Sequence, residues 1–303
     1  MVKRHYDESE LMKYNELDPN CTNFEDKVLL LHFDSFCLGD SVCFGSFIDH
    51  FVSYHKPKFV YITTFLRHIF QSNNPKVQFI ASTDNRETLT IDKLINIGYD
   101  KGNLDHTMGG MLYATKDTML LPQELKPGKV PVVPKERKII PNKITIAPET
   151  LKKIAEWDRD KWQLLVNVLV NNGFEVYNVS YEDEMKLDNV IDVHGFDDIN
   201  VSLDHILESR LFIGLSSGLA WLSWAYEVPV VMIGGFTKRH NEFDCYRVMS
   251  EYGCNGCFNV FKNISSHCPI FKDTDRSNEC SKLITVQMVI DKVNTALVEN
   301  PLN

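Results

Sequence analysis

Two neighbouring segments decide the fold: Leu211-Phe-Ile-Gly-Leu-Ser-Ser-Gly-Leu-Ala-Trp-Leu-Ser-Trp224 and Pro229-Val-Val-Met-Ile-Gly-Gly-Phe-Thr237. The first begins with a short apolar run, 211–214, which is typical of a buried strand. A turn of serine and glycine follows, and we expect a helix over 217–226. Residues 229–233 form the next apolar run. A strand, a helix and a strand in this order predict a parallel α/β sheet.

The same alternation extends along most of the chain as two series of strands and helices. The first series has predicted strands at 27–33, 58–62 and 77–80, and helices at 41–54 and 63–71. The second has strands at 143–147, 174–178, 211–214 and 229–233, and helices at 160–172, 202–208, 217–226 and 285–299. Gly173 is expected to end one helix at the C′ position, and Ser202 to cap the next.

The two series predict two Rossmann-like domains that face each other across a cleft. The less regular segment 108–141 contains five prolines, and we interpret it as the linker between them. The expected organisation is a polar extension over 1–24, an N-terminal domain over 25–140 and a C-terminal domain over 141–303. Because ligands of open α/β sheets bind at the carboxyl ends of the strands, we expect the site in the cleft.

Composition is that of a folded protein. The chain has 303 residues, of which 44% are hydrophobic and 24% charged, enough for a full core in one large or two ordinary domains. A formal net charge of -9 disfavours a nucleic-acid partner, because such binding needs clustered Lys and Arg. Residues 1–20 contain no apolar signal region, and no apolar run reaches about 18 residues. We therefore expect no membrane insertion and a cytoplasmic location.

Polar residues that could carry chemistry follow several predicted strands. After the first strand, Gly39 permits a tight turn and Asp40 is a candidate base for an acceptor hydroxyl; the alternative is that Asp40 only caps the helix. After the strand at 143–147, Lys152 or Lys153 is a candidate phosphate ligand, with a solvated surface as the alternative. Trp157 and Trp162 nearby are interpreted as packing residues.

Two later loops have the composition of a diphosphate site. The turn Ser216-Ser217-Gly218-Leu219 lets backbone amides and hydroxyls approach phosphate, although it is equally typical of an ordinary turn with a serine cap. It contains neither Walker A nor G-x-G-x-x-G. In the loop 234–243, Thr237 could bond a phosphate, Lys238 or Arg239 could neutralise it, and Glu242 could accept bonds from a ribose. A solvated loop is the alternative.

The spacing Cys254-x2-Cys257-x10-Cys268-x11-Cys280 predicts a metal site at 254–280. Two thiolates from a close Cys-x-x-Cys pair and two more cysteines complete a tetrahedron for zinc or iron. Four unrelated buried thiols are the alternative, and a redox pair is disfavoured because Cys254 lies in a late loop. Such a site would be structural, and it would hold the last helix or build a self-association surface.

Together these features resemble the bacterial autotransporter heptosyltransferases, which belong with the family 9 glycosyltransferases of GT-B fold. The resemblance rests on Leu38-Gly-Asp40, the two segments quoted at the start and the four-cysteine segment, and it is closest over 200–290. It implies inverting transfer of heptose from ADP-heptose to serine hydroxyls of a protein, without a catalytic divalent metal. It also implies an iron-carrying knuckle and assembly into a large ring, so we expect a homo-oligomer.

The resemblance also assigns roles to residues of this sequence. Asp40 matches the catalytic aspartate, and Lys153 or Lys152 matches a phosphate-binding lysine. Ser217, Gly218 and Thr237 match the nucleotide-sugar side of the site, which we extend to Gly39, Ser216, Leu219, Lys238 and Glu242. The four cysteines match the metal ligands. Domain 25–140 is then the acceptor side, and domain 141–303 binds the nucleotide sugar.

Members of the family carry a sizeable N-terminal domain that engages the acceptor, whereas about 24 residues precede the first strand here. Other acceptors therefore remain open: a lipopolysaccharide core, or hydroxymethylated cytosine in phage DNA with another nucleotide sugar as donor. A non-catalytic nucleotide-sugar-binding scaffold is a further alternative. A metal-dependent regulator that contacts nucleic acid is disfavoured by the acidic charge.

Overall fold

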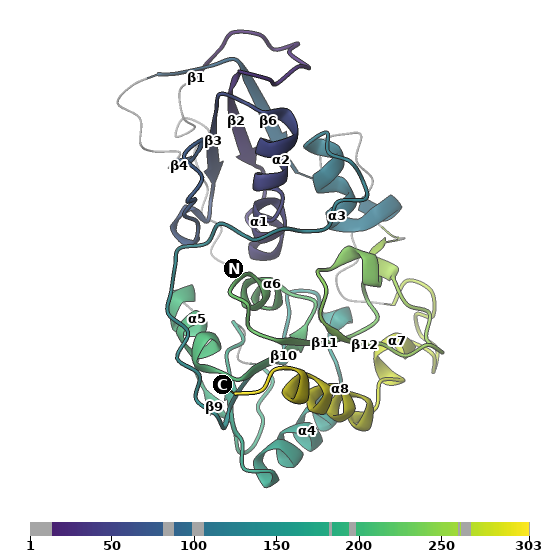
Figure 1. Ribbon diagram of the computed structural model, residues 1–303. Helices are drawn as coiled ribbons and strands as arrows, with labels where there is room; N and C mark the ends of the chain where they lie inside the picture. The colour runs from purple at the N-terminus through teal and green to yellow at the C-terminus, as the bar shows by residue number, and fades with distance from the viewer. Residues whose placement is uncertain are drawn as a thin grey trace. The chain divides into compact units, whose positions relative to one another are not determined.

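The computed structural model describes residues 14–80, 88–98, 106–181, 184–193, 198–259, 261 and 268–302 (Figure 1). The chain divides into two compact units. The first comprises residues 1–104 and 113–134, and the second comprises 105–112 and 135–303. This division lies at residues 134 and 135, a little before the predicted one at 140 and 141. Residues 105–112 also belong to the second unit.

Parallel strands form the sheet of the second unit. They are β7 (Lys143–Ala147), β8 (Glu175–Asn178), β9 (Ile191–Asp192), β10 (Leu211–Leu215), β11 (Val230–Ile233) and β12 (Tyr246–Val248). Their order across the sheet is β12-β11-β10-β7-β8-β9, and every neighbouring pair is parallel. β7, β10 and β11 are buried along their whole length, which is why their sequences are almost continuous apolar runs. The predicted parallel α/β sheet is confirmed.

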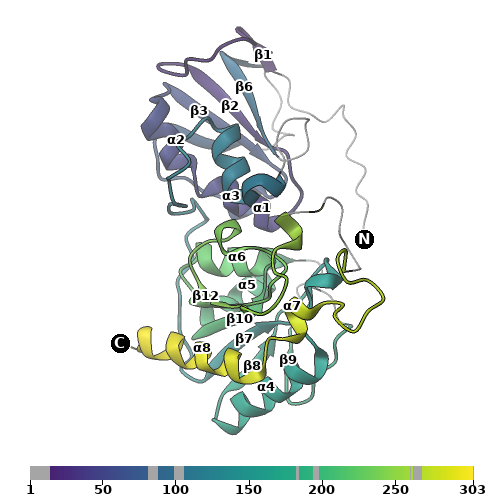
Figure 2. The same ribbon diagram turned by 90° about the vertical axis from the view of Figure 1, so that its right-hand side faces the viewer.

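Helices cover both faces of this sheet. They include α4 (Arg159–Asn171), α5 (Ile199–Glu208), α6 (Gly218–Ala225) and α8 (Val286–Glu299). α4 and α8 contact each other on one face, and α5 and α6 contact each other on the other (Figure 2). Trp157 and Trp162 are buried in the core with α4 and α8, as expected of packing residues. Gly173 has φ +86° after α4, the left-handed backbone that a C′ glycine adopts.

The first unit has a smaller parallel sheet with the order β4-β3-β2-β6. Its strands are β2 (Val28–Phe33), β3 (Phe59–Thr64), β4 (Val77–Ile80) and β6 (Lys93–Ile97), and its helices include α1 (Leu38–Gly45) and α2 (Ile48–His55). A separate parallel pair joins β1 (Tyr14–Glu16) to β5 (Leu89–Ile91). The extension predicted over 1–24 therefore contains a strand. Within the described ranges, no helix combines the length and the apolar character needed to cross a membrane.

In each main sheet the first strand lies inside the sheet, and the chain builds outward on one side before it turns to the other. β2 has β3 and β4 on one side and β6 on the other. β7 has β8 and β9 on one side and β10, β11 and β12 on the other. Such a reversal opens a crevice at the carboxyl ends of the strands, where α/β proteins bind ligands. The loop after β2, and those after β7 and β10, start at these two points of reversal.

Two helices expected in the first unit differ from the prediction. The helix over 41–54 is split into α1 and α2: Ser46 is the C-cap of α1, with its hydroxyl donating to the carbonyl of Cys43 at 2.7 Å, and Phe47 is the N-cap of α2. The helix expected over 63–71 is wrong. Thr63 and Thr64 extend β3 in register with β2, where β-branched side chains fit well, and only a short 3-10 turn, η2 (Arg67–Ile69), follows.

Two expectations from local patterns are also corrected. Ser202 does not cap α5: Asp198 does, because its carboxylate accepts the amide of Asn200 at 2.9 Å. Ser202 is buried and donates to the carbonyl of Val179, directly after β8. The segment interpreted as a linker contains α3 (His106–Thr118). This helix is interrupted at Gly110, whose φ of +74° lies in the left-handed region.

Candidate functional site

Asp40 lies in the first turn of α1, which follows the carboxyl end of β2. It is half-buried, and its Oδ2 accepts a hydrogen bond from the Ser35 hydroxyl at 2.6 Å. The capping alternative is wrong, because the N-cap residue is Cys37 and Asp40 stands three residues inside the helix. Gly39 is buried beside it. Ser35 therefore fixes one carboxylate oxygen; sequence reasoning did not single out this serine.

The loop after β10 places two serines at the start of α6. The Ser216 hydroxyl donates to Oε1 of Glu242, which lies on the loop after β11. Ser217 is the N-cap residue, yet its hydroxyl makes no capping bond and is buried without a partner among the described residues. Gly218 is the first helical residue, and Leu219 is half-buried. The serine-cap alternative thus lacks the side-chain bond that would define it.

The loop after β11 is not wholly solvated, contrary to the alternative. Thr237 is 3% exposed and Glu242 is 5% exposed, whereas Lys238 is exposed. Oε2 of Glu242 is buried and bonds to no described residue. A buried carboxylate oxygen without a donor is costly, so this atom is the kind that a ligand donor satisfies. Thr237 and Glu242 are joined by Arg247 of β12, which sequence reasoning missed because a lone arginine in a short strand carries no motif.

Lys153 follows β7 in the short 3-10 turn η3 (Lys153–Ala155). Its ammonium lies 2.8 Å from a carboxylate oxygen of Glu184, 3.1 Å from Glu156 and 4.0 Å from Glu149. The hydrogen bond to Glu184, aided by the bond to Glu156, raises the pKa of Lys153. Its charge is therefore compensated by carboxylates of its own unit. Lys152 is exposed, and the choice between the two lysines stays a prediction.

Glu149 is a second buried carboxylate at the carboxyl end of the sheet. It is 6% exposed, and its Oε1 accepts the backbone amides of Glu184 and Met185 at 3.1 and 3.0 Å. Oε2 is buried and has no hydrogen-bond partner in the described part of the chain. Burial raises the pKa of Glu149, against the opposing effect of the two amides. Glu149 belongs to no sequence motif, and only its place after a predicted strand pointed to it.

The cysteine segment contacts the loop after β11 directly. The amide of Gly256 donates to the carbonyl of Gly235 at 2.7 Å, and that of Phe258 donates to Phe236 at 3.0 Å. The aliphatic part of Lys238 covers Gly256, where a Cβ atom would lie 2.6 Å from its Cγ. Phe236 also packs with a core cluster formed by Ile154, Ala155, Cys257 and Cys268. The loops after β7 and β11 and the cysteine segment therefore form one packed structure.

The four thiols interact electrostatically, but the predicted metal site is not seen. Cys280 is influenced by Cys254, Cys257 and Cys268, so all four lie in one neighbourhood. Nevertheless, no group of three or more His, Cys, Asp or Glu side chains in the described ranges is arranged to hold a metal ion.

Burial and local hydrogen bonds set different proton affinities within this group. Burial raises the pKa of Cys280 to about 12 and that of Cys257 to about 11. Burial acts in the same direction on Cys268, but backbone N–H groups, first that of Asn278 and then that of Phe271, lower its pKa overall. The Phe271 amide donates to the Cys268 sulfur at 3.3 Å. Cys268 is thus the thiol best prepared to become a thiolate.

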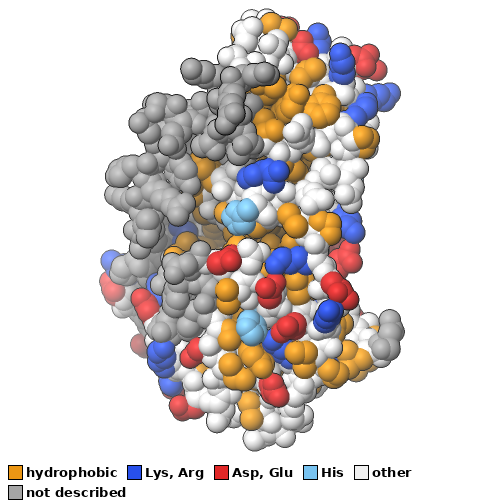
Figure 3. All heavy atoms as spheres, turned by 90° about the vertical axis from the view of Figure 1, so that its left-hand side faces the viewer, with side chains coloured by type: hydrophobic (Ala, Val, Ile, Leu, Met, Phe, Trp, Pro, Cys, Tyr) orange, Lys and Arg blue, Asp and Glu red, His pale blue; other side chains and the backbone are white. Residues whose placement is uncertain are grey.

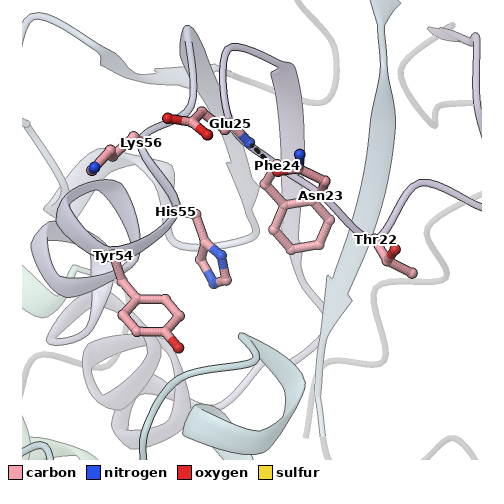
Figure 4. A pocket seen from close by; sticks show the side chains of 7 residues that line it. All are labelled: Thr22, Asn23, Phe24, Glu25, Tyr54, His55 and Lys56. Atoms are coloured by element: carbon pink, nitrogen blue, oxygen red, sulfur yellow. Dashed lines mark hydrogen bonds between the residues drawn. The ribbon is translucent and has the colours of Figure 1, made fainter.

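A cavity of about 170 Å³ lies elsewhere in the first unit, between the segment 22–25 and the end of α2 (Figure 4). Tyr54, His55 and Lys56 line one side of it. His55 is held by the carbonyl of Met119 at 2.9 Å, and burial lowers its pKa. None of the residues predicted for the site lines this cavity. On the face seen in Figure 3, cationic and anionic side chains are interspersed over much of the described surface.

Comparison with known proteins identifies autotransporter heptosyltransferases as relatives of the chain. No family model matches the chain. The chain is 27% identical to the autotransporter heptosyltransferase Aah of Escherichia coli over 292 residues, which covers 89% of this chain and 74% of Aah. It is 44% identical to the autotransporter heptosyltransferase TibC of enterotoxigenic Escherichia coli over 100 residues, only 25% of TibC. It is also 30% identical to an inactive autotransporter heptosyltransferase, BimC of Burkholderia thailandensis, over 163 residues, 38% of BimC.

Solved structures agree on the fold. The iron-containing dodecameric TibC superposes with a TM-score of 0.78 and 23% identity, over 91% of this chain and 78% of that one. The same protein is known in complex with ADP-D-beta-D-heptose. The ADP-heptose lipopolysaccharide heptosyltransferase II of Escherichia coli superposes with a TM-score of 0.59 and 12% identity, over 90% of this chain and 99% of that one. The chain is a homologue of the bacterial autotransporter heptosyltransferases, and its relatives and structural neighbours are glycosyltransferases.

Proposed function

We propose that this protein is an inverting glycosyltransferase that transfers heptose from ADP-heptose to a hydroxyl group, with a protein serine as acceptor. The observation that carries the proposal is the buried carboxylate of Glu242 at the carboxyl edge of the second sheet. One of its oxygens is bonded by Ser216, and the other has no donor among the described residues. The homology to heptosyltransferases, one of which is known with ADP-heptose, supports the choice of donor.

In this proposal the second unit binds the donor. The ribose hydroxyls bond to Glu242, and the diphosphate lies against the amino end of α6, where Ser217, Gly218 and Leu219 offer backbone N–H groups. Thr237 adds a hydroxyl. Lys153 or Lys152, together with Lys238, supplies positive charge to the departing ADP, so that no metal ion is required for this step. Gly39, directly before Asp40, is assigned to the same site.

Asp40 of the first unit then acts as the general base. Ser35 donates to Oδ2 of Asp40 and so orients the carboxylate, which takes the proton of the acceptor hydroxyl. The deprotonated oxygen forms a bond to the anomeric carbon while the bond from that carbon to the diphosphate oxygen breaks. The electron pair of that bond leaves with ADP. A single displacement inverts the anomeric configuration.

Replacement of Asp40 tests the reaction. Asp40→Asn keeps the shape and the bond from Ser35 but removes the base, so turnover of ADP-heptose should fall by about a hundredfold or more. Affinity for ADP, measured by calorimetry, should stay within about twofold. Equal turnover by the variant would refute the role of Asp40.

A second candidate is a binding scaffold without activity. It is favoured by the relative BimC, which is named as inactive although it is 30% identical over 163 residues. The scaffold binds ADP-heptose but neither transfers nor hydrolyses it. Mass spectrometry of a serine-rich autotransporter passenger incubated with wild-type protein and ADP-heptose separates the two: heptose adducts support the enzyme, and their absence despite ADP-heptose binding supports the scaffold.

We also propose that the four cysteines hold a structural iron or zinc ion. The ligand spacing, the shared neighbourhood of the thiols and the N–H bond to the Cys268 sulfur support a sulfur-rich site. The relative TibC is iron-containing and dodecameric, which supports iron and a homo-oligomer here. About one equivalent of iron or zinc in purified protein, lost in Cys254→Ser together with the oligomer on gel filtration, is expected. Metal-free wild-type protein would contradict the proposal.

A further inference from the structure

Arg247 joins two loop residues that the proposed donor site uses. This arginine of β12 is 5% exposed. Its Nη2 donates to Oγ1 of Thr237 at 2.8 Å, and to the carbonyls of Thr237 at 3.0 Å and Gly234 at 2.8 Å. Its Nη1 lies 3.8 Å from Oε1 of Glu242. One guanidinium thus contacts both ends of the loop that follows β11.

These contacts fix which atoms of the loop donate and which accept. The two hydrogens of Nη2 serve three acceptors, so Oγ1 of Thr237 and a backbone carbonyl share one of them. Because Oγ1 accepts in this shared bond, the hydroxyl hydrogen of Thr237 points to a different acceptor. Because Oε1 of Glu242 accepts the Ser216 hydroxyl and forms an ion pair with Arg247 at 3.8 Å, Oε2 is the oxygen that remains to accept a ligand hydrogen. The loop therefore presents a donor at Thr237 and an acceptor at Glu242.

This pattern matches the chemistry of a nucleoside diphosphate. Phosphate oxygens only accept hydrogen bonds at neutral pH, and a ribose diol donates them. Glu242 is a carboxylate in a buried place, where a charge without a partner is very unfavourable. The positive charge of Arg247 compensates it, and the planar guanidinium reaches two acceptors at once, which a lysine ammonium does not do in the same geometry.

We propose that Arg247 is a positioning residue for donor binding: it orients the Thr237 hydroxyl toward phosphate and the free oxygen of Glu242 toward the ribose hydroxyls of a nucleoside diphosphate. The proposal rests on the proposed function, because it assumes that the donor lies at these loops. Arg247 itself does not touch the ligand. It acts through Thr237 and Glu242.

The test compares Arg247→Lys with wild-type protein by calorimetry, using ADP and 2′,3′-dideoxy-ADP as probes. Wild-type protein should bind ADP about tenfold more tightly than the dideoxy analogue, because the analogue cannot donate to Glu242. Arg247→Lys keeps the positive charge but loses the planar guanidinium and its two terminal nitrogens. Its Kd for ADP should rise about tenfold or more, and its preference for ADP over the analogue should move toward one.

Two further variants separate positioning from folding. Lys143 is equally buried, pairs with Glu208 at 2.6 Å and stands at the opposite, amino end of β7, so Lys143→Met should lower Tm without changing the Kd for ADP. Thr237→Val removes the hydroxyl but leaves Arg247 beside Glu242, so it should weaken ADP binding and keep the ribose preference. This variant also serves as the readout if Arg247→Lys does not fold.

Three results overturn the proposal. One is wild-type affinity and ribose preference in Arg247→Lys. Another is a loss of ADP affinity in Lys143→Met equal to that in Arg247→Lys, which would mean that any loss of stability weakens binding. A wild-type protein that binds neither ADP nor ADP-heptose would overturn the proposed function as well, whereas the first two results leave the proposed function intact.

Discussion

Gly235 is the position at which the proposed donor loop is most sensitive to a small change. A Cβ atom added there would lie 1.8 Å from Oδ1 of Asn255 and 3.0 Å from Cβ of Cys280. Asn255 has little freedom to move, because its Nδ2 donates to the carbonyl of Ser250 at 2.6 Å. Gly235→Ala should therefore push the loop away from the cysteine segment.

The expected magnitude follows from this overlap. Insertion of a methyl group into a packed place costs about 1–3 kcal/mol, which for a chain of this size corresponds to a decrease in Tm of about 2–10 °C. Gly235 precedes Thr237 by two residues, so the displaced loop should also misplace the Thr237 hydroxyl. Loss of one well-placed bond to a charged phosphate weakens ADP binding by about tenfold or more.

The assay is thermal unfolding followed by calorimetric titration with ADP, with Gly173→Ala as the matched control. Gly173 has φ +86°, and no described atom lies within 4 Å of an added Cβ. Its replacement costs about 1–2 kcal/mol of backbone strain and should leave ADP affinity unchanged. Wild-type Tm and ADP affinity in Gly235→Ala would refute the reasoning, and so would an equal loss of affinity in Gly173→Ala.

Two further predictions concern the loop after β7. Lys153→Met should raise the Kd for ADP by about tenfold, whereas Lys152→Met should leave it unchanged. Neither variant should change Tm much, because exposed ion pairs contribute only about 0–1 kcal/mol to stability. If titrations show the larger loss of affinity in Lys152→Met, the phosphate role belongs to Lys152. Glu149→Gln should stabilise the protein, and more so at about pH 8 than at about pH 4. Burial raises the pKa of Glu149, so folding favours the protonated carboxyl group. The wild-type protein therefore loses stability as the pH rises above the pKa of the unfolded chain, and the variant does not. Thermal melts at both pH values check this, and an equal Tm difference at the two would contradict it.

The sequence was sufficient for the main strands and for most helices of the second unit. Continuous apolar runs such as those of β7, β10 and β11 have few alternatives to a buried parallel strand, because each is short and bounded by turns. α4 carries its own signals, with Asp158 as a cap and Gly173 at C′. Local chemistry decided these elements, so local patterns predicted them.

Prediction failed where distant residues outweighed local preference. β6, β12 and α3 went unrecognised, since strands as short as Tyr246–Val248 depend on the neighbour that they pair with. Thr63 and Thr64 became strand residues because β2 offered them partners. Ser202 lost its expected role because Asp198 stood earlier in the chain with a better-placed carboxylate. In each case the deciding contact lay outside the window that a pattern covers.

The candidate site divides in the same way. The order of residues alone places Asp40, the serine turn and the loop with Thr237 and Glu242 directly after predicted strands, and this position predicts them as site residues. The contacts of Ser216 and Arg247 with Glu242, and the bond from Gly256 to Gly235 that joins the cysteine segment to the same loop, become visible in the folded chain alone. The physical reason is that hydrogen-bond direction, burial and close backbone approach depend on segments that meet only when the sheet has formed.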